Sequence, residues 1–320
     1  MSKNTKIWLI IAASLLLLGC IIFGGVMSML KWDFIKLSTN KYEINNYEIN
    51  ENFRSILVDT NTADVKFIPS EDSQCSVECY EHNNLRHSVA VKDGTLVIEI
   101  VDTRKWYEHI GINFGAPKIS VYIPQGKYDT LSVKSDTGDV EISKVFSFES
   151  INVSASTSDV TNYASVSGSV KIKTSTGNIL VENISAGSLD LSVSTGRVCV
   201  SGVTCEGDVS VKVSTGKANL TDTRCKSVIS SGDTGDIFLK NVIAWEKFSI
   251  ERSTGDVKFD GSDAAEIFVE TDTGDVTGSL LADKVFIART DTGDIDVPNS
   301  ITGGRCEITT DTGDIKITIN

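Results

Sequence analysis

Apolar and polar residues alternate over most of the chain, in short runs that return at a fixed spacing. The clearest runs flank a Thr that recurs every 19 or 20 residues. Its ten copies are Thr137, Thr157, Thr176, Thr195, Thr215, Thr234, Thr254, Thr273, Thr292 and Thr312. Successive side chains of a strand point to opposite faces, so alternation with period two is typical of strands. Each repeat therefore predicts short strands with one apolar face.

Each repeated Thr stands in a polar corner between two strands. The most complete corners read Asp-Thr-Gly-Asp, as at residues 272–275 and 311–314. Gly takes positive φ values without steric cost, so Gly among Asp, Ser and Thr indicates a tight turn. A repeat of this length buries its apolar face by stacking on its neighbours. We predict an all-β fold, a parallel β-solenoid (β-helix) of about ten 19–20-residue coils over residues 131–320.

The start of the chain has a different pattern. A polar tail, residues 1–6, precedes residues 7–30, which carry no charge. As a helix this segment would be about 36 Å long, enough to cross a hydrocarbon core of about 30 Å. It predicts one transmembrane helix. Cys20 resembles the lipidated Cys of a bacterial lipoprotein, but apolar residues follow it, which favours the uncleaved span.

The residues between this helix and the repeats are predicted to link them and to cover one end of the solenoid. Residues 31–53 are rich in Asn, Lys and Glu and predict a tether. Residues 54–130 begin with a degenerate copy of the repeat, in which Ala63 replaces Gly, and continue with more alternating runs. We predict a degenerate first coil with a β-rich capping insertion, because an exposed end coil would offer an unpaired edge. At the far end, residues 315–320 are expected to form the last, open strand.

The chain is acidic, with a net charge of −13, and its acid is concentrated in the corners. This charge disfavours nucleic acid and anionic lipid as partners. Stacked carboxylates are oxygen ligands of the kind that calcium takes. The calcium candidates are Asp233, Asp236, Asp272, Asp275, Asp291, Asp294, Asp311 and Asp314. Asn178, Arg197 and Lys217 interrupt the second Asp position, which favours the alternative that these side chains cap backbone N–H groups; we expect no cofactor, with calcium as the open possibility.

Cysteines and histidines are the remaining candidates for chemistry. Cys205 and Cys225 should lie on successive coils at a separation that allows a disulfide, but two reduced thiols are favoured, since no other spacing indicates a disulfide framework. His82, His87 and His109 all fall in the insertion, near the aromatic side chains of residues 106, 107 and 114. No nucleophile is matched to a base there. We therefore predict no catalytic residues and no enzymatic activity.

Several features together resemble one known family. They are the apolar start, the degenerate copy at residues 59–65, the run at residues 118–124 that leads to Leu131, and the Ser/Asp-Thr-Gly-Asp repeats. In this combination the chain resembles the DUF4097 "putative adhesin" family of bacterial envelope proteins. The resemblance implies a membrane-anchored, surface-exposed β-solenoid, associated with adhesion or with envelope-stress systems such as the LiaG-like proteins. It implies no catalytic residues.

We predict a non-enzymatic, single-span protein of the cell membrane whose large domain lies outside the cytoplasm. Positive charges flank the span almost equally, so the orientation rests on the position of the span at the extreme N-terminus. The solenoid would be an adhesin or a binding and scaffolding surface for an unknown protein or a cell-wall polymer. One alternative is a structural polymer made by end-to-end self-association. The other is a polysaccharide-acting β-helix enzyme, which would require a carboxylate cluster within residues 70–118.

Overall fold

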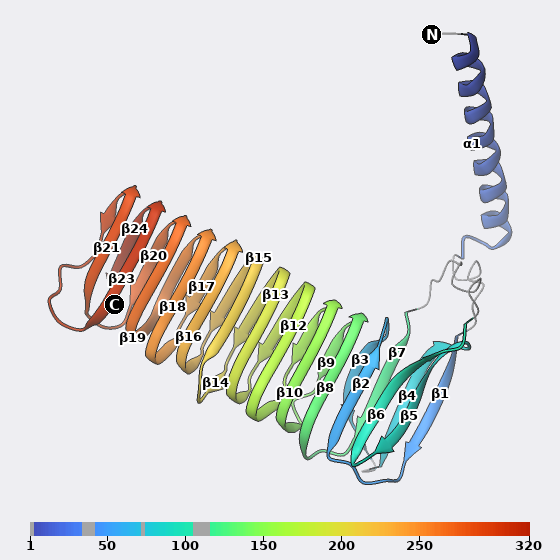
Figure 1. The fold of residues 1–320 in the computed structure, drawn as a ribbon, viewed down its shortest axis with the longest axis horizontal. Coiled ribbons are helices and arrows are strands. Elements are labelled where there is room, and N and C mark those ends of the chain that lie inside the picture. Colours follow the sequence, from blue (N-terminus) through green and yellow to red (C-terminus); the bar gives the residue numbers. More distant parts are fainter. Residues whose placement is uncertain (1–2, 34–41, 72–73, 105–115) are drawn as a thin grey trace.

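The structure is a computed structural model that describes residues 3–33, 42–71, 74–104 and 116–320. One helix precedes a long stack of strands (Figure 1). The helix, α1, spans Lys3–Met29 and is long and apolar enough to cross a membrane, a test that a signal sequence near an N-terminus also passes. The strands are β1 (Tyr42–Ile49), β2 (Ser55–Thr60), β3 (Asp64–Pro69), β4 (Cys75–His82), β5 (Leu85–Lys92), β6 (Thr95–Asp102), β7 (Lys118–Ile123), β8 (Lys127–Thr137), β9 (Val140–Ile142), β10 (Ser147–Thr157), β11 (Val160–Asn162), β12 (Ser165–Glu182), β13 (Ser185–Ser201), β14 (Thr204–Cys205), β15 (Val209–Thr221), β16 (Arg224–Thr234), β17 (Ile237–Lys240), β18 (Ile243–Thr254), β19 (Val257–Thr273), β20 (Val276–Leu280), β21 (Lys284–Thr292), β22 (Ile295–Asp296), β23 (Gly304–Thr312) and β24 (Ile315–Ile319).

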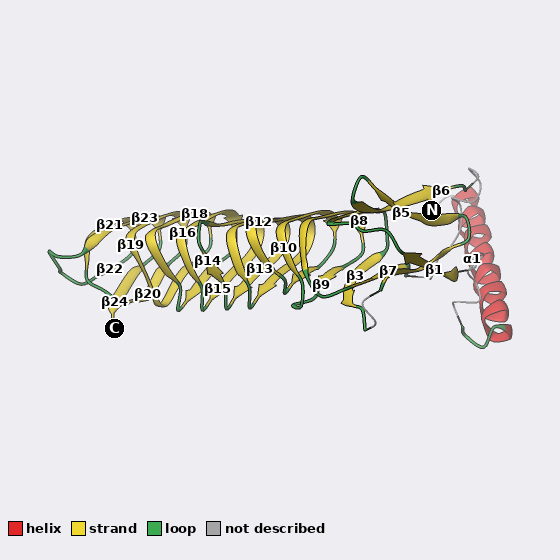
Figure 2. Ribbon diagram, turned by 90° about the horizontal axis from the view of Figure 1, so that it is seen from below, coloured by secondary structure: helices red, strands yellow, loops and turns green. Residues whose placement is uncertain are grey.

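The repeats form the predicted parallel β-solenoid. Strands of successive coils pair in parallel, with Thr157 opposite Thr137 on one side and opposite Thr176 on the other. Figure 2 shows the strands in two layers along the rod. The inward side chains form columns between these layers, and Ile172, Leu191 and Val211 are one such column. Burying each such side chain contributes roughly 1.5–3 kcal/mol, so the predicted apolar ladders hold the coils together.

Glycine at the corner allows the coils to approach closely. Gly216 has φ of 137°, in the region that L side chains rarely adopt. A Cβ atom at this position would lie 1.7 Å from the carbonyl oxygen of Gly196 in the neighbouring coil. Gly235 stands in the same relation to Gly216, also at 1.7 Å. The repeated Gly is therefore required both for the turn and for the distance between coils.

The N-terminal end of the stack is covered by antiparallel strands. The first coil, β2 and β3, lies between β6 and β7 on its outer side and β8 and β9 on its inner side. Beyond them β4 pairs antiparallel with β7, β1 with β4, and β5 with β6. The segment expected as a tether, residues 31–53, therefore contains a strand. Tyr47 and Ile49 of β1 pack against the core, and this contact holds the strand in place.

The last two repeats stack in the reverse of their sequence order. β23 lies between β19 and β21, and β24 lies between β20 and β22. The coil that contains Thr292 is therefore the outer end, and the expectation that residues 315–320 form the open strand is wrong. Residues 290–295 and 310–315 have identical sequences. Periodicity therefore predicts these two coils but not their order.

Replacing Gly216 with Ala is expected to lower the free energy of unfolding by about 3 kcal/mol or more, because the new Cβ would meet the Gly196 oxygen at 1.7 Å and the backbone would be strained. The measurement is denaturant unfolding of the full-length protein in detergent. Gly126→Ala is the control, since a Cβ there has no neighbour within 4 Å. Equal stability of the two variants would contradict the role assigned to the glycine column.

Candidate functional site

Two places in the structure bring candidate functional side chains together: the acidic corners and the N-terminal cap. In several corners the Asp at the second position caps the neighbouring coil. Asp275 Oδ1 accepts a hydrogen bond from the N–H of Asp314 at 2.8 Å, and Asp314 Oδ1 accepts one from the N–H of Asp294 at 2.9 Å. Asp236 Oδ1 accepts from the N–H of Asp256 in the same way, at 3.2 Å. The carboxylates thus join neighbouring coils through backbone donors.

Cationic side chains sit beside some of these carboxylates. Lys217 Nζ lies 2.9 Å from Asp236 Oδ2, and its hydrogen bond is the main cause that lowers the pKa of Asp236. The N–H of Asp294, and then Lys316, lower the pKa of Asp314. A calcium ion at these positions would compete with a lysine, while the first-position carboxylates of Asp233, Asp272, Asp291 and Asp311 are exposed. Within the described residues, no three carboxylates of these columns have ligand atoms within 4.8 Å of one another.

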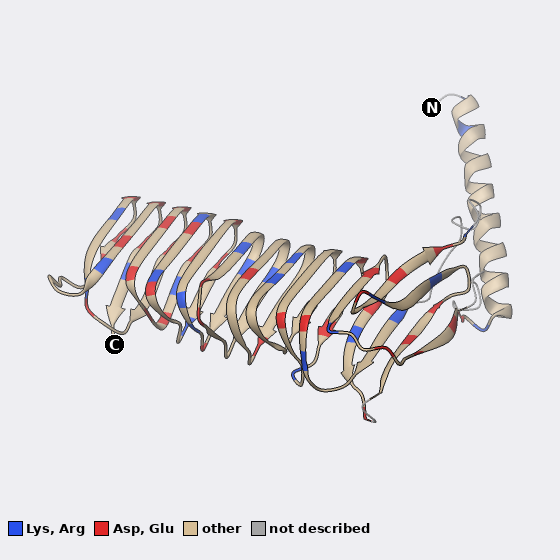
Figure 3. Ribbon diagram, turned by 60° about the horizontal axis from the view of Figure 1, so that its bottom comes forward, with Lys and Arg blue, Asp and Glu red and all other residues tan. Residues whose placement is uncertain are grey.

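Acidic residues recur along the rod in Figure 3. The two Asp positions of a corner are expected to contribute differently to stability, because the second caps a neighbouring coil and the first is exposed. Asp275→Ala is expected to lower the free energy of unfolding by about 1 kcal/mol, because the N–H of Asp314 loses its acceptor. Asp272→Ala, at an exposed position three residues earlier, is the control and should change stability little. Denaturant unfolding at pH 7, with and without calcium, compares the two variants with the wild type.

The lowered pKa of Asp236 implies stability that is present above about pH 4 and is lost as the pH falls through the folded-state value. Unfolding of the wild type at pH 7 and pH 3 measures the stability lost on acidification.

The cap holds a cavity of about 380 Å³ beside the end of the first coil. Thr60 and His87 line it, together with Tyr42, His82, Arg104 and Ile100. Two of the predicted histidines, His82 and His87, thus reach this cavity. His109 and the aromatic residues 106, 107 and 114 lie outside the described residues.

Two of the lining residues, Thr60 and His87, belong to a chain of hydrogen bonds. His87 Nδ1 lies 2.7 Å from Glu81 Oε2, and His87 Nε2 lies 3.0 Å from the hydroxyl of Thr60. Glu81 also accepts hydrogen bonds from the backbone N–H of His87 and from Asn45 Nδ2, each at 2.7 Å. Glu81 is 1% exposed and His87 5%, so these groups are desolvated and depend on one another for partners.

Thr60 occupies a position at which other coils carry a hydroxyl that donates a hydrogen bond to a backbone carbonyl of the corner. In this register Thr60 lies opposite Ser135, whose hydroxyl donates to the carbonyl of Thr137 at 2.8 Å. Thr310, at the corresponding place near the other end, donates to the carbonyl of Gly274. In the first coil the hydroxyl contacts His87 instead. The cap thus uses a structural hydroxyl of the repeat to hold an imidazole.

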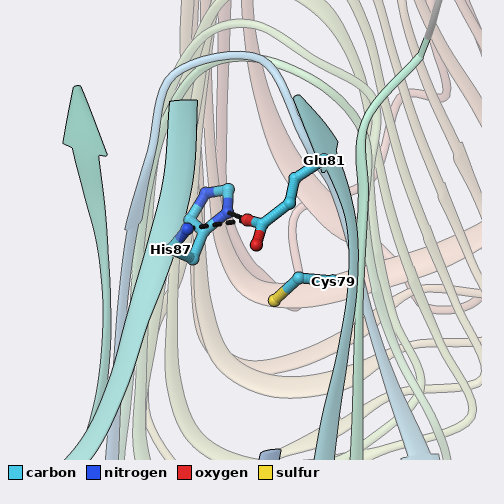
Figure 4. Close-up of side chains that lie close together, drawn as sticks. All are labelled: Cys79, Glu81 and His87. Carbon is cyan, nitrogen blue, oxygen red and sulfur yellow. Dashed lines mark hydrogen bonds and ion pairs between the residues drawn. The ribbon is translucent and has the colours of Figure 1, made fainter. Parts of the chain in front are cut away.

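Cys79 completes the cluster (Figure 4). One ligand atom each from Cys79, Glu81 and His87 lies within 4.8 Å of the other two, and all three residues are buried. Burial, with the charge of Glu81 as the next cause, raises the pKa of the Cys79 thiol to about 12. Sequence reasoning found His87 but missed Cys79, Glu81 and Thr60. The available signal was Glu81, a charged residue on the inward, alternating face of a strand.

The other cysteines are free as well. Cys205 and Cys225 are buried on neighbouring coils, where Thr204 pairs with Arg224, and neither is in a disulfide. Burial raises the pKa of Cys225 to about 12 and raises that of Cys205. These thiols are core side chains in this structure.

Comparison with known proteins identifies one matching family. The sequence profile of the Toastrack DUF4097 family matches residues 53–224 and 204–320, which together cover most of the chain. A search of proteins with curated functions found no match.

Solved structures with a similar fold come from bacteria. A "putative adhesin" from Parabacteroides merdae is 14% identical, with a TM-score of 0.52 over 77% of this chain and 98% of that one. A "putative adhesin" from Bacteroides fragilis is 21% identical, with a TM-score of 0.46 over 87% and 97% of the two chains. A "putative lipid binding protein" from Parabacteroides distasonis is 16% identical, with a TM-score of 0.44 over 74% and 94%. Of these three, the Parabacteroides merdae structure has a TM-score above 0.5, and at 14% identity that likeness concerns the fold alone.

Proposed function

We propose, because this chain belongs to the Toastrack DUF4097 family, that it is a non-enzymatic envelope protein. In this proposal α1 anchors it in the cell membrane and the solenoid lies outside the cytoplasm as a rigid binding surface. The partner we propose is a cell-wall polymer that carries negative charges along its length. Such a polymer is extended and repetitive, as the rod itself is.

One row of outward side chains carries this proposal. Lys and Ser alternate along it from coil to coil: Lys134, Ser154, Lys173, Ser192, Lys212 and Ser231. All three lysines are exposed. At a strand spacing of about 4.8 Å they recur about every 10 Å, although the protein as a whole is acidic. A row of evenly spaced cations favours a polyanion whose charges recur along its length, and several weak contacts on one chain add up through multivalency.

The enzyme alternative has less support within the described part of the insertion. Its buried carboxylate, Glu81, is held by the side chain of Asn45 and by two donors of His87. A carboxylate that works on a polysaccharide must reach its substrate in a groove. We therefore keep the non-enzymatic proposal.

The test uses full-length protein reconstituted in membranes and mixed with purified bacterial cell walls. We expect it to sediment with the walls, more weakly at high salt, and weakly with walls from which the anionic polymers have been extracted. Replacing Lys134, Lys173 and Lys212 with Gln should lower the affinity about tenfold or more, since several contacts of one polymer are lost together.

A variant with Gln at Lys226, Lys240 and Lys258 has the same change in charge and is the control. In cells, the chain should retain residues 1–30, and a C-terminal tag should be accessible to external protease. Equal binding by both triple variants, or a chain cleaved before Cys20 or elsewhere within residues 1–30, would reject the proposal in its present form.

A second candidate function, self-association, is favoured by the outer coil at the C-terminal end. Leu281, Val285, Ile295 and Ile301 are exposed there, Ile301 at 89%. Antiparallel strands cover the other end of the stack, which disfavours head-to-tail filaments. Two copies joined at their C-terminal ends by a two-fold axis would cover these side chains on both.

This candidate predicts a monomer–dimer equilibrium of the full-length protein in detergent, measured as mass against concentration by light scattering. Ile295→Ser should shift the equilibrium toward the monomer, because an apolar contact is lost twice in a two-fold interface. Ile229→Ser, which replaces an exposed Ile on the side of the rod, should leave it unchanged. A constant monomer mass at all concentrations would exclude the candidate.

A further inference from the structure

We propose that Cys79, Glu81 and His87 form a binding site for one divalent cation of the zinc class in the N-terminal cap. The three side chains belong to β4 and β5, which are joined by a tight turn at Asn83 and Asn84. They point toward one another in Figure 4.

The donor set fits zinc in its chemistry. Zn²⁺ takes thiolate, imidazole and carboxylate ligands together, at about 2.0–2.3 Å, in tetrahedral sites. Ligand atoms around such an ion lie about 3–4 Å apart, and here the three lie within 4.8 Å of one another. Small side-chain rotations would therefore close the site. Calcium and magnesium prefer oxygen ligands alone, so a Cys and a His disfavour them.

The charge balance favours a bound cation. Without one, the buried carboxylate of Glu81 and the buried thiol of Cys79 share a desolvated space. A divalent cation would be neutralised by the thiolate of Cys79 and the carboxylate of Glu81, with a neutral imidazole as third ligand. The site would then carry no net charge, which is the least costly state for a buried ionic group. Binding would release the thiol proton to solvent.

Thr60 can hold the imidazole in either state. In the ion-free site His87 Nδ1 lies 2.7 Å from Glu81 Oε2 and Nε2 lies 3.0 Å from the Thr60 hydroxyl, so a neutral ring with its proton on Nδ1 would donate to the carboxylate and accept from the hydroxyl. With an ion on Nδ1, the proton would sit on Nε2 and donate to the Thr60 oxygen. A hydroxyl serves both tautomers, because it donates and accepts. Asn45 Nδ2 donates to the second Glu81 oxygen, Oε1, at 2.7 Å, so the ion would need only Oε2.

The competing explanation is a purely structural cluster, in which the His87–Glu81 hydrogen bond ties the cap hairpin together. Both explanations predict that losing Glu81 or His87 destabilises the cap. The two explanations differ in what they predict for Cys79, because the hydrogen bond between His87 and Glu81 does not involve its sulfur. Cys75 lies on the same inward face of β4, four residues earlier, is buried, and is outside the cluster. It provides a matched control.

The experiment uses the full-length protein in detergent, reduced and stripped of metal by a chelator. Titration with Co²⁺ should produce thiolate-to-metal absorption that saturates at one ion per chain, and Zn²⁺ should displace it. Cys79→Ala should abolish the absorption and reduce zinc affinity by more than about 100-fold, beyond the range seen for residues that only orient a ligand. Cys75→Ala should retain both.

Thr60→Val tests the positioning role. It keeps the shape of the side chain, and we expect about 10–100-fold weaker zinc binding with the absorption still present. Circular dichroism of each variant reports whether the β-structure is intact. Absence of a thiolate band in the folded wild type, or equal affinity of the Cys79→Ala and Cys75→Ala variants, would overturn the proposal. Failure of cell-wall binding would leave this result untouched, because the cation site and the lysine row are separate.

Discussion

The close approach of backbone to backbone at each glycine corner is the constraint on which the rest of the rod depends. A Cβ atom at Gly216 or Gly235 would fall 1.7 Å from a carbonyl oxygen of the next coil. This contact fixes the register, since a coil that slipped by one residue would place a side chain in the gap. With the register fixed, Thr lies over Thr, apolar side chains fall into columns, and each capping carboxylate meets the N–H of the next coil.

The two ends of the stack are closed in different ways. At the N-terminal end the parallel pattern is replaced by antiparallel strands, and their inner face holds a buried carboxylate beside an imidazole. Glu81 and His87 are buried there with hydrogen-bond partners. At the C-terminal end the chain turns back and places β24 inside the sheet. The polar, irregular end is thus the one suited to binding chemistry, and the regular body is suited to extended contact.

The sequence predicts the body of this molecule far better than its ends. Repeated apolar pairs such as Val170 and Ile172 predict strands, stacking and core, since each position is sampled ten times over. The order of the last two coils is not predictable from periodicity, because residues 290–295 and 310–315 are identical. The cap cluster joins Thr60, Cys79 and His87 from three different strands. Their proximity follows from strand pairings that occur in the cap and not in the repeats, so the repeat pattern of the sequence does not predict it.

The C-terminal strand that lies inside the stack also has a consequence for how such a protein changes in length. A coil added next to β24 would not lengthen the rod at its tip, because β24 lies between β20 and β22 and the coil of Thr292 forms the tip. Both ends are therefore fixed assemblies, and the interchangeable units are the interior coils between them. Each gained or lost unit of 19 or 20 residues changes the length of the rod by about 4.8 Å. Evolution can thus adjust the reach of the rod in small, equal steps without redesigning either end.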